Sequence, residues 1–303
     1  MGKRIKNFLI YAGVRLGLGL LGWLRLPRAL RWGRRLGRIA YRFARTERRR
    51  CDEHIALALP ALDEQARRDL ARRVFENLGQ GVAEVVCAAR GKIPELARYV
   101  ALTDASRQVL DTALGQGRGV VFVTGHCGNW ELMARGLAAC GYPIHTIGQK
   151  SYDPRFTRLL DRFRLSGGVH TVWRGEPDIF ERMARVLRDK AVMGLLIDQD
   201  TRVPSVFVDF FGRPASTPTA AAVLARKCRA AVVTGFNHRQ REGGLVIEIE
   251  PFPLCDEQDF KRAVAEDTRA LTARIERFVR AHPDEWIWMH RRWKTKEGSD
   301  TFT

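Results

Sequence analysis

Short apolar runs of six or seven residues, separated by amphipathic stretches, dominate the chain from about residue 98 onward. Six of these runs have the length and composition of buried strands: 119–124, 143–148, 191–197, 206–211, 230–236 and 245–250. Helical spacing of apolar residues fills several of the intervals, at 130–140, 154–165, 217–228 and 257–281. Strands that alternate with helices predict an α/β fold, with a mixed, mostly parallel central sheet flanked by helices on both faces.

The N-terminal part of the chain is both basic and apolar. The first 50 residues carry 15 Lys and Arg against one acid, Glu47, and the whole chain has a net charge of +18. Residues 8–24 form an apolar run that only Arg15 interrupts with a charge. A basic arm that binds nucleic acid does not require so many leucines. The pattern therefore favours binding to an anionic membrane surface over binding to nucleic acid.

We therefore expect residues 1–26 to form a helical membrane anchor and residues 27–303 to form a single domain. The run of 17 residues is at the lower limit of the ~17–25 needed to cross a bilayer, and an arginine at the bilayer centre is costly. Shallow insertion or marginal spanning is the expectation, with an amphipathic helix packed on its own domain as the alternative. Arg15 and the lack of a small-residue cleavage site disfavour a cleaved signal peptide.

Between the expected anchor and the first strand, the sequence is helical. A second basic amphipathic segment runs from Pro27 to about Arg50, and Asp63 is placed to cap a long helix that follows it. The six cysteines include no C-x-x-C pair and no metal-binding spacing. This usage is typical of a reduced, cytoplasm-facing domain, with no structural disulfide and no metal expected.

The segment GVVFVTGHCGNWEL at 119–132 carries the clearest chemical signal. A buried strand ends at His126, and a turn leads into a helix that contains Glu131. Sites in α/β sheets lie at such strand ends. Across the turn, the Glu131 carboxylate can fold back onto the imidazole, so that Glu131 holds the ring while His126 removes a proton from an alcohol. The backbone amides of Gly128 and Asn129 would face the developing oxyanion.

Two other interpretations of this segment remain open. His126 and Glu131 could simply cap the helix and complement its dipole. Cys127 could instead be a nucleophile beside the histidine, although neighbours at a strand end tend to point to opposite faces.

The segment G-H-C-G-N-W-E at 125–131 resembles the H-x-x-x-x-(D/E) motif of glycerolipid acyltransferases, in the form typical of the bacterial late lipid A acyltransferases. Further marks of that family follow in its order: Arg164 with Gly167, then Arg174, LLIDQD at 195–200, VDFFGRPASTPTAAAVLA at 208–225 and HPDEWIWMHRRWK at 282–294. The chain departs from the family at His54-Ile55, where members usually carry Asn-Leu, and we interpret that region as structural.

The resemblance implies a glycerol-3-phosphate acyltransferase-like fold and an enzyme of the bacterial inner membrane whose catalytic domain faces the cytoplasm. It would move a fatty acyl group from acyl carrier protein to a hydroxyl of a lipid A precursor, with no cofactor. Arg164 and Arg174 would contact anions of the substrate, unless they are ordinary surface arginines. Asp198 would be a hydrogen-bonding group of the site or a turn residue.

Two rival functions follow from the same residues. Another glycolipid, such as a phosphatidylinositol mannoside, could be the acceptor. A non-enzymatic basic protein that binds membrane or nucleic acid is disfavoured, because the chemical motif lies in the near-neutral body and the charge lies in the N-terminal segment.

Overall fold

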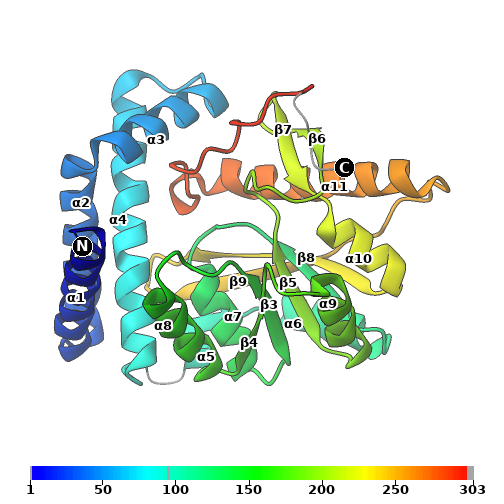
Figure 1. Ribbon diagram of the computed structural model, residues 1–303, viewed down its shortest axis with the longest axis horizontal. Helices are drawn as coiled ribbons and strands as arrows, with labels where there is room; N and C mark the ends of the chain where they lie inside the picture. The colour runs from blue at the N-terminus through cyan, green and yellow to red at the C-terminus, as the bar shows by residue number, and fades with distance from the viewer. Residues whose placement is uncertain (1, 94–95, 299–303) are drawn as a thin grey trace.

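Seven strands form the central sheet of the computed structural model, which describes residues 2–93 and 96–298 (Figure 1). In spatial order the strands are β1 (Val100–Leu102), β9 (Leu245–Pro251), β8 (Ala231–Arg239), β2 (Val120–Thr124), β5 (Val192–Leu196), β3 (Ile144–Gly148) and β4 (Val169–Trp173). Every neighbouring pair is parallel except β8 and β9. The predicted α/β fold with a mixed, mostly parallel sheet is confirmed.

Both faces of the sheet are covered by helices, and strand β2 shows why. Its side chains alternate, so that Val121 and Val123 belong to one apolar core while Val120 and Phe122 belong to the other. The first core is closed by α9 (Ile179–Arg188), α10 (Ala220–Cys228) and α11 (Phe260–Ala281), and the second by α6 (Asp104–Gly115), α7 (Trp130–Ala139) and α8 (Pro154–Leu165). A strand buried on both faces is continuously apolar, as this one is.

Four strands differ from the prediction. The run at 206–211 was expected in the central sheet, but β6 (Ser205–Asp209) pairs antiparallel with β7 (Pro214–Pro218) in a separate two-stranded sheet. An apolar run predicts burial without specifying which sheet it joins. Strands β1, β4 and β7 were not predicted: β1 has only three residues, the edge strand β4 carries an exposed His170, and β7 is rich in Pro, Ser and Thr and overlaps the helix expected at 217–228.

Four helices precede the sheet and stand together beside it: α1 (Gly2–Trp23), α2 (Leu26–Phe43), α3 (Arg45–Ala58) and α4 (Glu64–Ala89) (Figure 1). The predicted cap of α4 is confirmed, because the Asp63 side chain accepts a hydrogen bond from the amide of Ala66 at 2.7 Å. Helix α2 packs directly on α4 through glycine. A Cβ atom on Gly37 would lie only 2.1 Å from the carbonyl oxygen of Phe75. The short helix α5 (Leu96–Tyr99) and a 3₁₀ turn at Pro283–Glu285 complete the elements.

The N-terminal segment, as far as the structure describes it, does not form the membrane-spanning version of the expected anchor. No helix among the described residues is long and apolar enough to cross a membrane, so a spanning segment within residues 1–26 is not supported. Arg15 and four glycines interrupt the apolar run at 8–24.

Candidate active site

The turn from β2 into α7 carries His126, and the neighbouring residues Gly128 and Asn129 hold its conformation. The side chain of Asn129 caps α7 by accepting from the amide of Leu132 at 3.1 Å. Gly128 has a φ of +59°, and a Cβ there would lie 2.1 Å from the carbonyl oxygen of Asn237. Only glycine fits a turn with both a left-handed backbone and such a close approach.

The backbone amides of Gly128 and Asn129 do not have the role expected of them. The Gly128 amide donates to the carbonyl oxygen of Glu285 at 2.7 Å, and the Asn129 amide donates to Oδ1 of Asn237 at 2.9 Å. Both groups are already hydrogen-bonded within the protein, so neither is available to a substrate oxygen here. These two hydrogen bonds hold the turn in place instead.

A buried ionic network supports the same turn from below. The side-chain amide of Asn129 donates to Glu84 at 2.8 Å, and Glu84 also pairs with Arg239 at 3.1 Å. Arg239 pairs in turn with Glu285 at 2.5 Å. Burial raises the pKa of Glu285, and the charge of Arg239 opposes that rise. The network joins α4, β8 and the C-terminal segment, so three distant parts of the chain hold the turn.

His126 is paired with Asp198. Nδ1 of His126 lies 2.8 Å from Oδ1 of Asp198, and the backbone amide of His126 donates to Oδ2 at 2.8 Å. The Asp198 side chain is 1% exposed and that of His126 is 21% exposed. Burial alone would raise the pKa of Asp198, but the charge of His126 and its hydrogen bonds lower it to about 2. The carboxylate is therefore ionised at neutral pH and accepts a hydrogen bond from Nδ1–H, which leaves the lone pair of Nε2 free to take a proton.

The partner of His126 was expected to be Glu131, and the structure corrects this. Strands β2 and β5 are parallel neighbours, so their carboxyl ends lie side by side. His126 follows β2 and Asp198 follows β5, which brings these two residues together. Glu131 lies in the first turn of α7 and pairs with a residue of α8 instead.

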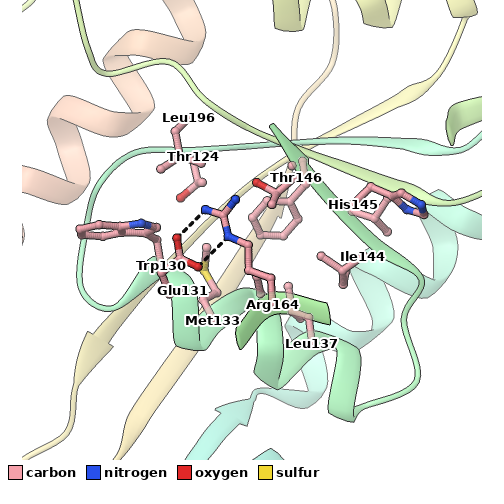
Figure 2. A pocket seen from close by; sticks show the side chains of 14 residues that line it. Thr124, Trp130, Glu131, Met133, Leu137, Ile144, His145, Thr146, Arg164 and Leu196 are labelled. Carbon is pink, nitrogen blue, oxygen red and sulfur yellow. Dashed lines mark hydrogen bonds and ion pairs between the residues drawn. The ribbon is translucent and has the colours of Figure 1, made fainter. Parts of the chain in front are cut away.

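The pairing of Glu131 with Arg164 is bidentate (Figure 2). Nε of Arg164 donates to Oε2 of Glu131 at 2.9 Å and Nη2 donates to Oε1 at 2.5 Å. The two side chains are 16% and 10% exposed, so the pair is mostly buried. Arg164, an expected anion contact, thus has its charge balanced within the protein.

Arg174, the second expected anion contact, lies just after β4. Its side chain donates to Gln149 at 3.4 Å, and burial lowers the pKa of Arg174. Gln149 lines the large groove described below, so Arg174 lies near its rim.

Two apolar cavities meet at the motif. An inner pocket of about 40 Å³ lies beneath the Glu131–Arg164 pair, among apolar side chains that include Leu137 and Ile144 (Figure 2). A larger groove of about 680 Å³ runs between α1, α4 and α8. Trp130 and Glu131 line both cavities. Apolar walls that end at a polar pair suit a hydrocarbon chain with a polar reacting end.

Trp286 is a site residue that sequence reasoning did not assign. Its indole N–H donates to Oδ2 of Asp198 at 2.8 Å, and its side chain is buried. The signal was present in the aromatic ending at 282–294, which left open a helix cap, a membrane contact or a substrate contact. In the structure, this segment holds the Asp198 carboxylate through Trp286.

Cys127 is not placed to be a nucleophile. Its side chain is 1% exposed, and burial raises the pKa of its thiol well above the ordinary value. The thiolate, which is the reactive form, is therefore suppressed. In the part of the chain that the structure describes, no group of three or more His, Cys, Asp or Glu side chains is arranged to hold a metal ion.

The His126–Asp198 pair at the strand ends is arranged as a general base, and Trp130 and Glu131 of the same motif line two apolar cavities, an arrangement suited to an enzyme that transfers acyl groups to hydroxyls. The chain belongs to the bacterial lipid A biosynthesis acyltransferase family, whose model matches residues 3–295. It is 27% identical over 297 residues to the lipid A biosynthesis lauroyltransferase of Escherichia coli K12, which covers 93% of this chain and 91% of that protein. The myristoyltransferase of the same strain is 26% identical over 278 residues, covering 87% and 80%.

A second group of relatives is named for a different acceptor. The phosphatidylinositol mannoside acyltransferase of Mycobacterium tuberculosis CDC 1551 is 29% identical over 222 residues, which covers 72% of this chain and 68% of that protein. Both groups are acyltransferases, and the chain is an acyltransferase of this family.

Proposed function

We propose that this enzyme transfers a fatty acyl group from acyl carrier protein to a hydroxyl of a lipid A precursor. The observation that carries the proposal is the His126–Asp198 pair at a strand end, in a motif whose Trp130 and Glu131 line two apolar cavities. The match across residues 3–295 to the lipid A family supports the acceptor. The basic chain, with a net charge of +18, suits an acidic carrier and a phosphorylated acceptor.

In the proposed reaction, Nε2 of His126 removes the proton of the acceptor hydroxyl as its oxygen attacks the thioester carbonyl. Asp198 holds the ring in the required tautomer and stabilises the imidazolium that forms. The carbon–sulfur bond then breaks, and the sulfur leaves with the proton from the imidazolium. The products are an ester and the free thiol of the carrier. This chemistry uses no cofactor.

Glu131 keeps a catalytic role in this proposal, although a different one from the expected pairing with His126. Glu131 lines both the inner pocket and the groove, and its carboxylate fixes Arg164 in the wall of the inner pocket. We assign the pair to orienting the thioester, with the guanidinium charge next to the carbonyl oxygen as negative charge develops there.

We further propose that the enzyme acts at the cytoplasmic face of the bacterial inner membrane as a peripheral protein. Large apolar side chains are exposed on both α1 and α2, among many arginines: Leu16, Leu20, Trp23, Trp32, Leu36, Ile39 and Phe43. A helix with exposed Trp and Leu between arginines is suited to lying in the interface of an anionic bilayer.

A phosphatidylinositol mannoside is the second candidate acceptor, because mycobacterial relatives named for that acceptor match at 29–30% identity. The test is to offer the purified enzyme an acyl carrier protein thioester with either acceptor and to identify the products by mass spectrometry. The proposal predicts acylation of the lipid A precursor. Transfer to the mannoside alone would replace it with the second candidate.

The donor is tested in the same assay by comparing the carrier thioester with the coenzyme A thioester. We expect the carrier to be preferred, with a preference that shrinks as rising salt shortens the Debye length from ~10 Å toward ~3 Å. Equal turnover of both donors at all salt concentrations would contradict the carrier assignment.

A further inference from the structure

A third cavity, of about 420 Å³, lies apart from the catalytic motif and shares no lining residue with the inner pocket or the groove. One wall is a single face of α3, and the other is the C-terminal segment after Trp288. The lining residues are Thr46, Arg49, Arg50, Glu53, His54, Arg291, Trp293 and Lys294. Its size falls in the ~300–1,000 Å³ range of pockets that hold small molecules or head groups.

The two walls are fixed to one another by hydrogen bonds. Nη1 of Arg50 donates to the carbonyl oxygen of Met289 at 3.1 Å, and Nδ1 of His54 donates to that of Trp288 at 2.7 Å. The rings of His54 and Trp293 meet edge to face, with centroids 5.1 Å apart. The departure from the family pattern at His54 therefore lies in this wall.

The cavity is strongly cationic. Four of its lining side chains are Arg or Lys and one is a carboxylate. Arg49 pairs with that carboxylate, Glu53, at 2.7 Å, and Lys294 lies 3.7 Å from Asp200. Among the described residues, Arg50 and Arg291 have no acidic partner. Two guanidinium groups on opposite walls thus have no carboxylate of the described protein within ion-pair distance.

We propose that this cavity binds the phosphate of the acceptor lipid's head group. Guanidinium forks on two sides match the geometry of a phosphate, and the Trp293 ring offers an apolar wall to the attached sugar. The inference deepens the proposed function and rests on it, since both candidate acceptors carry a phosphate.

The position of the cavity favours a lipid over a carrier protein. Helix α3 begins two residues after Phe43, which ends α2, is 73% exposed and belongs to the apolar face that we assign to the membrane. With that face on the membrane, a phosphate held by Arg50, seven residues beyond Phe43, would lie near the lipid head groups. A folded carrier presents its acids on a convex helix, which does not enter a cavity of this volume.

The test uses the full chain and needs no acyl transfer. Binding is measured to phosphatidylcholine vesicles that contain a diacylated, phosphorylated glucosamine disaccharide, and to vesicles with the same lipid after removal of its phosphates. The wild type should prefer the phosphorylated lipid. The Arg50→Gln/Arg291→Gln variant should lose about tenfold or more of that preference, because each charge-assisted hydrogen bond to phosphate is strong.

Two further variants make the result specific. Arg118→Gln/Arg269→Gln removes the same charge from exposed arginines outside the cavity and should keep the preference. Arg291→Gln alone leaves every hydrogen bond between the walls intact and should show a partial loss, even if the double variant folds poorly.

Three outcomes would overturn the proposal: a preference that survives in Arg50→Gln/Arg291→Gln, an equal loss in the Arg118/Arg269 control, or a raised KM for the carrier with lipid binding unchanged. The last would assign the cavity to the donor. Failure of the proposed function is a separate result, seen as absent acyl transfer to the lipid A precursor by the wild type.

Discussion

Oδ1 of Asp198 lies 2.8 Å from Nδ1 of His126, and Oδ2 of the same carboxylate accepts the indole N–H of Trp286. An amide in place of this carboxylate can present its N–H₂ group to Nδ1 and so move the ring proton to Nε2. Asp198→Asn should therefore lower acyl transfer by roughly 10²–10⁴-fold, as tautomer errors do in comparable pairs. The rate is measured with carrier-bound donor and checked against circular dichroism. A variant that keeps half of the wild-type rate would show that Asp198 does not orient His126.

The depressed pKa of Asp198 predicts a pH dependence of stability. Its folded-state pKa of about 2 lies below the ordinary aspartate value of ~3.9. The ionised carboxylate therefore stabilises the fold above pH ~4, and this contribution is lost as the pH falls from ~4 toward 2. Urea unfolding of the wild type and Asp198→Asn should show a free-energy gap that narrows over this window. A gap that stays constant between pH 6 and 3 would contradict the assignment.

The buried Glu131–Arg164 pair allows structural and catalytic effects to be separated. Glu131→Gln leaves a mostly buried guanidinium without its counter-charge and should lower the free energy of unfolding by about 3 kcal/mol. Adding Arg164→Met removes the unpaired charge, so the double variant should recover much of that stability. Acyl transfer should stay impaired in both variants. Recovery of activity together with stability would mean that the pair serves only the fold.

Helix α1 supplies part of a wall of the large groove through Val14, Arg15 and Leu18. Deletion of residues 1–26 should leave a folded domain, because the sheet and both cores are formed by later residues, and the deleted segment adds only Leu24 and Leu26 at the margin of the second core. Activity on lipid acceptor should fall at least tenfold, since the groove and the membrane-facing helix are both lost. Vesicle sedimentation in high salt is the second readout. If the truncated protein still sediments, the principal membrane contact lies outside this segment.

The position of His126 could be predicted from the sequence, but its partner could not. A buried strand, the turn through Gly128 and the helix that begins at Trp130 are all local signals, and each is confirmed. The pairing with Asp198 depends on β5 lying next to β2, which is a long-range fact that sequence spacing does not contain. Glu131 was nearer along the chain, yet α7 directs it toward α8.

The difference between local and long-range information also explains which strands could be predicted. Strands buried on both faces, such as β2 and β5, have continuous apolar runs and were predicted. The edge strand β4 carries His170 at an exposed position and resembled a loop. The backbone amides of Gly128 and Asn129 were expected to face the substrate, because free amides at a helix start bind anions. In the structure, Glu285 and Asn237 already accept hydrogen bonds from these two amides.

The measurement that bears most directly on the account is acyl transfer by His126→Ala, compared with His238→Ala as a matched control. The two side chains are similarly exposed, at 21% and 20%, but the His238 ring stacks on that of His282, whereas His126 pairs with Asp198. His126→Ala should lose roughly 10²–10⁴-fold in rate with an unchanged circular dichroism spectrum, while His238→Ala should keep most of its activity. If His126→Ala retains more than about a tenth of the wild-type rate, a loss well short of that range, His126 is not the base that activates the acceptor hydroxyl.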